Sequence, residues 1–156
     1  MNTHVAVREM RNSAGGLGGD STWTRYLVPL GRAAFAGIFV GTAPLNFSQQ
    51  GIAEAAQQGV PLPQLLVPLS ALISLAGGLS VLLGYRAKLG AWLLMLFLVP
   101  VTVMMHNFWA VKDPMGAQIQ LGFFLANLSR LGTALLIAHF GAGPFSLDAR
   151  ALARRP

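Results

Sequence analysis

Few side chains in this sequence can carry chemistry, and four of them lie in or beside long apolar runs. His106 and Trp109 belong to the sequence His106-Asn107-Phe108-Trp109. A histidine ionises near neutral pH and can transfer a proton or bind a carbonyl oxygen. Arg130 offers a planar fork of donors to an anion or an oxygen atom, and Asn127 lies one helical turn before it. We therefore take His106, Asn127, Arg130 and Trp109 as candidate ligand-binding residues, and no residue as catalytic.

Each candidate also has a purely structural interpretation, which the sequence leaves open. His106 could bond to loop backbone at a helix end, and Trp109 could anchor the chain among lipid headgroups. Arg130 could be satisfied by Asn127 and backbone carbonyls, although charges inside membrane helices are functional more often than not. We interpret Arg32 and Asn107 as structural polar residues.

Metal, thiol and nucleic-acid chemistry have no support in the residue pattern. The chain has no cysteine, and its three histidines, His4, His106 and His139, fall in a tail and at opposite ends of the expected helices. No nucleophile–base pair, phosphate loop or dinucleotide motif occurs. The net charge of +6 comes from short basic clusters beside apolar segments rather than from a basic stripe. We therefore expect no metal, no covalently bound cofactor and no nucleic-acid partner.

The elements that position these residues are long apolar helices. The chain is 54% hydrophobic and only 10% charged, with a mean hydropathy of +0.57, whereas soluble domains carry about 25% charged residues. About twenty apolar residues cross a bilayer as a helix, and four segments have that length: Arg25–Asn46, Leu65–Gly84, Leu89–Trp109 and Leu121–Phe140. The sequence predicts an all-α membrane protein with an antiparallel bundle of four transmembrane helices, in contact with the lipid bilayer.

Side-chain periodicity indicates which helix faces meet. One stripe of the first helix should face protein, and it contains Arg32, Phe35, Phe39, Ala43 and Asn46. In the second helix Ser70, Ser74, Gly77 and Val81 form a small-residue face for close packing, and Gly78 lies beside it. Pro100 should kink the third helix. Arg130 should turn inward with Gln120, Asn127 and Ala134. A short surface helix is expected within Ile52–Gln58, and a loop over residues 110–120.

Charge sets the expected orientation and domain limits. If both termini and the Tyr85–Lys88 turn are cytoplasmic, nine of the eleven Lys and Arg lie on that side, with only Lys112 opposite and Arg130 inside the membrane. This bias predicts an N-in, C-in topology. We expect residues 1–24 to be a flexible cytoplasmic tail, residues 25–148 the four-helix transmembrane domain, and residues 149–156 a basic cytoplasmic tail.

An ordered set of short motifs resembles the DoxX family of four-span bacterial membrane proteins, over about Tyr26–Asp148. Gly59-Val60-Pro61-Leu62-Pro63 resembles its entry to the second helix, and His106-Asn107-Phe108-Trp109 its His-Asp/Asn-Phe-Trp signature. The ending Gly143 to Asp148 resembles its Gly-x-x-Ser-Leu-Asp pattern. This chain lacks three charged residues that are usual in the family. Near the end of the first helix it has Thr42–Asn46, before the paired glycines Gly77-Gly78 it has Ser74, and before Asn127 it has Ala126.

The resemblance implies a function that the residues alone do not. Some DoxX relatives are similar to the small subunit of thiosulfate:quinone oxidoreductase, so we expect an accessory subunit of a quinone-linked redox complex in the bacterial inner membrane. A membrane-bound redox protein would be its partner, and a quinone or lipid would bind near His106, Asn127 and Arg130. The alternative is a structural or assembly subunit with no ligand or catalysis of its own. A transporter is a weaker third interpretation.

Overall fold

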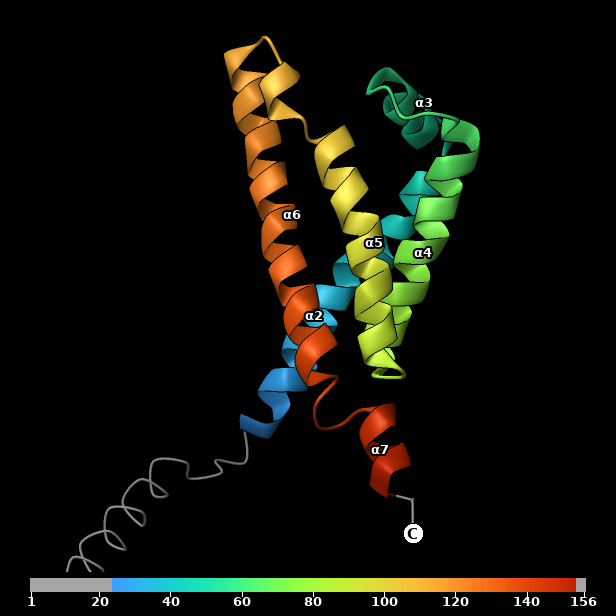
Figure 1. The fold of residues 1–156 in the computed structure, drawn as a ribbon, viewed down its shortest axis with the longest axis vertical. Helices are drawn as coiled ribbons and strands as arrows, with labels where there is room; N and C mark the ends of the chain where they lie inside the picture. Colours follow the sequence, from blue (N-terminus) through green and yellow to red (C-terminus); the bar gives the residue numbers. More distant parts are fainter. Residues whose placement is uncertain (1–23, 154–156) are drawn as a thin grey trace, which may run out of the picture.

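Four long helices coincide with the four apolar runs (Figure 1). The structure, a computed structural model, describes residues 24–153. Its elements are η1 (Thr24–Tyr26), α2 (Leu27–Thr42), η2 (Ala43–Phe47), α3 (Gln49–Gln57), α4 (Pro63–Leu83), α5 (Ala87–Met105), η3 (Phe108–Ala110), α6 (Pro114–Phe140) and α7 (Leu147–Ala153). No strand occurs in this part of the chain. Since α2 with η2, α4, α5 with η3, and α6 are long and apolar enough to cross a membrane, the prediction of an all-α, four-span membrane protein is confirmed.

The spans pack in an open series rather than in a closed ring. In Figure 1, α5 lies between α4 and α6, and α2 crosses behind them to reach α4. The short helix α3 covers one end of α2 and α4, while α7 lies at the opposite end of the molecule. Consequently α6 is an edge helix, with only 11% of its apolar window buried, against 28–33% for the other spans.

The core forms where all four spans approach one another. Phe39 of α2, Val81 of α4, Leu94 and Leu98 of α5, and Ala134 of α6 belong to one buried cluster. Of the stripe predicted on the first helix, Arg32, Phe35, Phe39 and Ala43 are buried and Asn46 at its end is half-buried. The periodicity of apolar residues therefore indicated the correct inward face of α2.

Two adjacent glycines let α4 contact a different helix on each side. A Cβ atom on Gly77 would lie 2.9 Å from the Gly90 carbonyl oxygen of α5, and one on Gly78 would lie 3.1 Å from the Phe39 Cβ of α2. Ser74 and Val81 are buried on the same part of α4. This is the close packing that small residues allow in membrane helices, as the sequence predicted.

The last span begins earlier than predicted. Residues 110–120 were expected to form a loop, but α6 starts at Pro114. The Asp113 carboxylate accepts a hydrogen bond from the Gly116 N–H at 2.6 Å, and proline at the first helical position needs no donor. The loop prediction was wrong because this segment, although polar, contains a capping sequence that starts a helix.

The other predicted ends shift by a few residues. The first predicted span ends as the 3-10 helix η2, which contains Pro44, and α5 ends at Met105, so that His106 and Asn107 lie outside it. The expected surface helix is α3, capped by Ser48, whose hydroxyl accepts the Gly51 N–H at 3.1 Å. Residues 147–153, partly assigned to a basic tail, form α7. The predicted tail over residues 1–24 lies outside the described residues, apart from Thr24.

Candidate functional site

His106 is held against the start of α6. Its Nδ1 lies 2.9 Å from Oε1 of Gln120, and its ring lies 5.4 Å from that of Phe123. The side chain is half-buried. The Gln120 contact occupies Nδ1. Nε2 makes no hydrogen bond to the described residues, so it is the ring nitrogen that can bind another partner. This geometry differs from the alternative of a histidine bonded to loop backbone.

Trp109 packs on α6 one turn further along. The rings of Phe108 and Trp109 lie 5.5 and 6.0 Å from Phe124, both edge-on. Trp109 is 58% exposed and sits in η3, beyond the end of α5. Half-buried Asn107 begins this 3-10 turn, with its carbonyl accepting the Ala110 N–H at 2.8 Å. This exposed ring at a helix end fits an anchor among headgroups.

Asn127 and Arg130 form a separate pair deeper in α6. Arg130 Nη1 donates to Asn127 Oδ1 at 2.5 Å. Asn127 is buried, while Arg130 is half-buried. The structure therefore brings the four candidates to the same helix, α6, but in two groups: His106 and Trp109 against its first turns, and Asn127 with Arg130 further along. Two cavities are described below. His106 lines one of them, and the other three candidates line neither.

A cavity of about 470 Å³, here called the α3 cavity, lies between α4 and α5 beneath α3. Ligand pockets in proteins are typically about 300–1,000 Å³. The cavity is lined by residues of η2, α3, α4 and α5 and of the loops after α3 and α5: Asn46, Gly51, Ala55, Val60, Leu66, Val67, Leu69, Ser70, Ile73, Leu96, Phe97, Pro100, Val101, Met104, Met105 and His106. Its volume and shape suit a small or elongated apolar group.

The polar groups of the α3 cavity gather at one end. Asn46 lies near the end of η2 and His106 directly follows α5, at the end of the molecule that carries α3. Ser70 is already used, because its hydroxyl donates to the Val67 carbonyl at 2.8 Å. From His106 to Leu96 the lining follows α5 for ten residues, or about 15 Å at 1.5 Å per residue. The cavity thus has a polar end at Asn46 and His106, here called its mouth, and its lining along α5 is about half as long as a bilayer's hydrocarbon core is thick.

Sequence reasoning missed the α3 cavity, apart from His106. Its walls are Leu, Ile, Val, Phe and Met, which look the same in sequence whether they pack a core or line a void. One signal was present: Pro100 has no N–H, so the Leu96 carbonyl lacks its usual helical donor. Both residues line the cavity.

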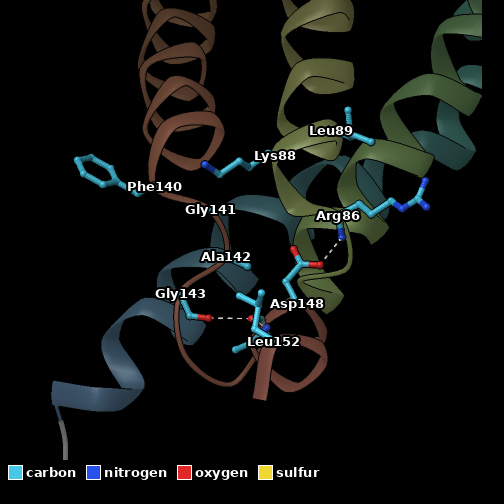
Figure 2. Close-up of a pocket in the computed structure, with 11 residues that line it drawn as sticks. Arg86, Lys88, Leu89, Phe140, Gly141, Ala142, Gly143, Asp148 and Leu152 are labelled. Carbon is cyan, nitrogen blue, oxygen red and sulfur yellow. Dashed lines mark hydrogen bonds between the residues drawn. The ribbon is translucent and has the colours of Figure 1, made fainter. Parts of the chain in front are cut away.

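A second hollow, the basal groove, lies at the opposite end and measures about 550 Å³ (Figure 2). Figure 2 shows the Asp148 carboxylate aimed at the backbone of Arg86, while the Arg86 guanidinium points away. Asp148 Oδ1 accepts the Arg86 N–H at 2.8 Å and Oδ2 accepts the Ala87 N–H at 3.0 Å. Asp148, the acidic residue in the lining of the groove, therefore caps the N-terminus of α5 from its position in α7.

The same end is tied together by Arg32. Its Nη1 donates to the Ala142 carbonyl at 2.6 Å and its Nη2 to the Phe145 carbonyl at 3.0 Å. Arg32 is only 8% exposed. The guanidinium joins α2 to the segment between α6 and α7. The hydrogen bonds of Arg32 are thus those of a structural residue. At the basal groove, both Arg32 and Asp148 bind backbone groups.

Metal binding finds no geometric basis in the described part of the chain. Residues 24–153 contain no group of three or more His, Cys, Asp or Glu that could hold a metal ion. His106 and His139 lie beyond the end of α5 and in the last turn of α6.

Comparison with known proteins corrects the family assignment. Residues 65–152 match the SURF4 family, which is 88 of 156 residues and covers α4, α5, α6 and most of α7. No curated protein and no solved structure matches the chain. The DoxX resemblance was wrong, and with it the interpretation as a subunit of a quinone-linked redox complex and the basis for placing the chain in the bacterial inner membrane.

The structure explains why the short motifs misled. The Gly143 to Asp148 ending consists of helix caps: the Ser146 hydroxyl accepts the Ala149 N–H at 3.1 Å, and Asp148 caps α5. Asp113-Pro114 likewise starts α6. Signals of this kind recur wherever helices begin and end, so they report architecture rather than descent or chemistry. By the match over more than half of its length, this chain is a multi-pass membrane protein that belongs to the SURF4 family.

Proposed function

We propose that this chain binds the apolar tail of a membrane amphiphile in the α3 cavity, with the polar end of the ligand beside His106. The observation that carries the proposal is the cavity itself: about 470 Å³, lined mainly by apolar residues of α4 and α5, with Asn46 and His106 at the ends of η2 and α5 and with the Ser70 hydroxyl already bonded to backbone. That polarity gradient matches a molecule with one polar and one apolar end.

The dimensions support a tail from a single leaflet. The lining extends about 15 Å along α5 from His106, and the hydrocarbon core is about 30 Å thick. Met104 and Met105 near the mouth are flexible side chains that adapt to ligands of different shape. The cavity is therefore suited to a chain whose head remains at one membrane surface.

Selectivity would come from the polar mouth. Lipid tails are as apolar as the cavity wall, so tail burial distinguishes weakly between ligands. With Nδ1 donating to Gln120 Oε1, His106 Nε2 can accept a hydrogen bond from a headgroup O–H or N–H, and the Asn46 amide can donate to a headgroup oxygen. The other candidates, Asn127, Arg130 and Trp109, have no part in this proposal, since they do not line the cavity.

We also propose the N-in, C-in orientation, with the α3 cavity opening toward the non-cytoplasmic leaflet. The support is the charge bias, because Arg32, Arg86, Lys88 and Arg150 lie at the α7 end and Lys112 at the α3 end. In this arrangement residues 25–148 constitute the transmembrane domain, and residues 149–156 are cytoplasmic.

Filling the cavity tests the proposed function. Val101 lines the α3 cavity, whereas Val103 on the same helix is 51% exposed on the outer surface. Tryptophan at Val101 should occupy the space of a tail, while tryptophan at Val103 should leave the cavity open. We expect native mass spectrometry of the protein released from nanodiscs to show at least about tenfold less retained amphiphile for Val101→Trp, and no change for Val103→Trp.

A photoactivatable fatty acid provides an independent readout. Labelled adducts in wild-type protein should map to α4 and α5 peptides that line the cavity, such as those containing Ile73 or Phe97. Equal retention by both tryptophan variants, or adducts spread evenly over the lipid-facing residues, would refute a tail-binding cavity.

A further inference from the structure

Arg130 places a positive charge deep within the membrane, where a charged group needs partners. It lies ten residues before the end of α6, or about 15 Å from Phe140, which is near the centre of a hydrocarbon core about 30 Å thick. A guanidinium at that depth is costly to insert unless it finds partners. An arginine side chain is too short to reach the headgroups from there by snorkelling.

The described residues satisfy only a fraction of this group. The single hydrogen bond of Arg130 goes from Nη1 to Asn127 Oδ1, whereas a guanidinium has five N–H donors. The acids of the whole sequence are Glu9, Asp20, Glu54, Asp113 and Asp148, and none falls within the four spans. This chain therefore has no carboxylate of its own spans to pair with Arg130.

The face of α6 beside Arg130 is only partly covered, with Ala126 and Thr133 half-buried, and it is built of small residues. Gly122, Ala126, Ser129 and Thr133 recur at helical spacing on one stripe, here called the α6 outer stripe. Gly122 and Ser129 are exposed, and a Cβ on Gly122 would meet nothing within 4 Å. Arg130 borders the stripe between Ala126 and Thr133. Small residues let another helix backbone approach closely in a membrane.

We propose that the α6 outer stripe binds a transmembrane helix of another protein, whose mid-span Asp or Glu pairs with Arg130. Charge complementarity selects this occupant, because an arginine fork binds a carboxylate through two parallel hydrogen bonds. A second copy of this chain fits poorly: a two-fold contact would place two Arg130 guanidinium groups near each other in a medium of low dielectric. A lipid phosphate lies too far away, at the membrane surface.

Site-specific crosslinking in membranes of the source organism tests the surface. Ser129 lies on the α6 outer stripe, and Leu128, 52% exposed, points to a different side of the same helix. With p-benzoylphenylalanine in place of Ser129, we expect a protein adduct whose crosslinked peptide belongs to a transmembrane segment containing Asp or Glu. The same photoprobe in place of Leu128 should not give that adduct.

The charge requirement is tested separately. Arg130→Gln should reduce the Ser129 adduct by at least about tenfold, and reversing both charges, with Arg130→Asp here and arginine replacing the partner's acid, should restore it. This rescue keeps the test valid even where Arg130→Gln alone impairs folding. Adducts with lipid only or with a second copy, an adduct insensitive to Arg130→Gln, or failure of the reversal would overturn the proposal. None of these results bears on the α3 cavity.

Discussion

At the scale of single residues, Gly84 at the α7 end of the molecule lets the turn between α4 and α5 pack closely against the segment before α7. Gly84 has φ +65°, and a Cβ atom there would overlap the Ser146 Cβ and lie 3.1 Å from Arg32 Nη1. It thus supplies both the left-handed backbone that ends α4 and the space for the segment before α7. Neither requirement tolerates a larger side chain.

Replacing Gly84 by alanine should therefore impose two penalties. Left-handed backbone costs alanine about 1–2 kcal/mol, and overpacking adds about 1–3 kcal/mol. Gly59 is the matched control, since it has φ +79° but open space around its Cβ position. Reversible unfolding in mixed micelles should show Gly84→Ala to be destabilised by more than Gly59→Ala. Equal losses for the two variants would show that the Ser146 contact is not tight.

At the scale of elements, the N-terminus of α5 depends on a residue distant in sequence. No local side chain caps α5, and the residue before it, Arg86, has φ +48°. Its first N–H groups instead donate to Asp148 of α7, and the Asp148 N–H donates to the Gly84 carbonyl at 2.8 Å. The negative carboxylate also suits the positive end of the helix dipole. Short α7 and long α5 thus stabilise each other.

Asp148→Asn should loosen this connection without removing the side chain. The amide keeps one acceptor oxygen but loses the charge and the second acceptor, which we expect to cost about 1–3 kcal/mol of unfolding free energy. Glu54→Gln is the control, because Glu54 is exposed and its carboxylate accepts a hydrogen bond from the nearby Gln50 amide at 3.0 Å. Hydrogen exchange of the Arg86 and Ala87 amides should accelerate in Asp148→Asn. Unchanged protection of these amides would contradict the capping role.

At the scale of the whole molecule, the open series of helices leaves two distinct surfaces for binding. The α3 cavity lies between α4 and α5 at one end, and the α6 outer stripe lies on the edge helix. A closed bundle would bury α6 on both sides, whereas here only 11% of its apolar window is buried. Both proposals follow from this openness, but each rests on different residues.

The proposed orientation can be measured directly because the chain contains no cysteine. Single substitutions Glu54→Cys on α3 and Arg150→Cys on α7 place one thiol at each end of the molecule. In intact cells a membrane-impermeant maleimide should label Glu54→Cys, while Arg150→Cys should react only after permeabilisation. The opposite labelling pattern would invert the proposed topology.

The sequence by itself determined the fold class, the number of spans and the inward face of α2, because apolar length and helical periodicity are local properties. It also showed that Arg130 lies deep in the last span. It misassigned the family, because motifs such as Gly143 to Asp148 consist of helix caps that recur in many proteins. Only tertiary structure revealed that Asp148 caps α5, that Arg32 joins α2 to the chain after α6, and that apolar residues of α4 and α5 enclose a cavity. Those features depend on contacts between residues far apart in the chain, and a void has no residue type of its own.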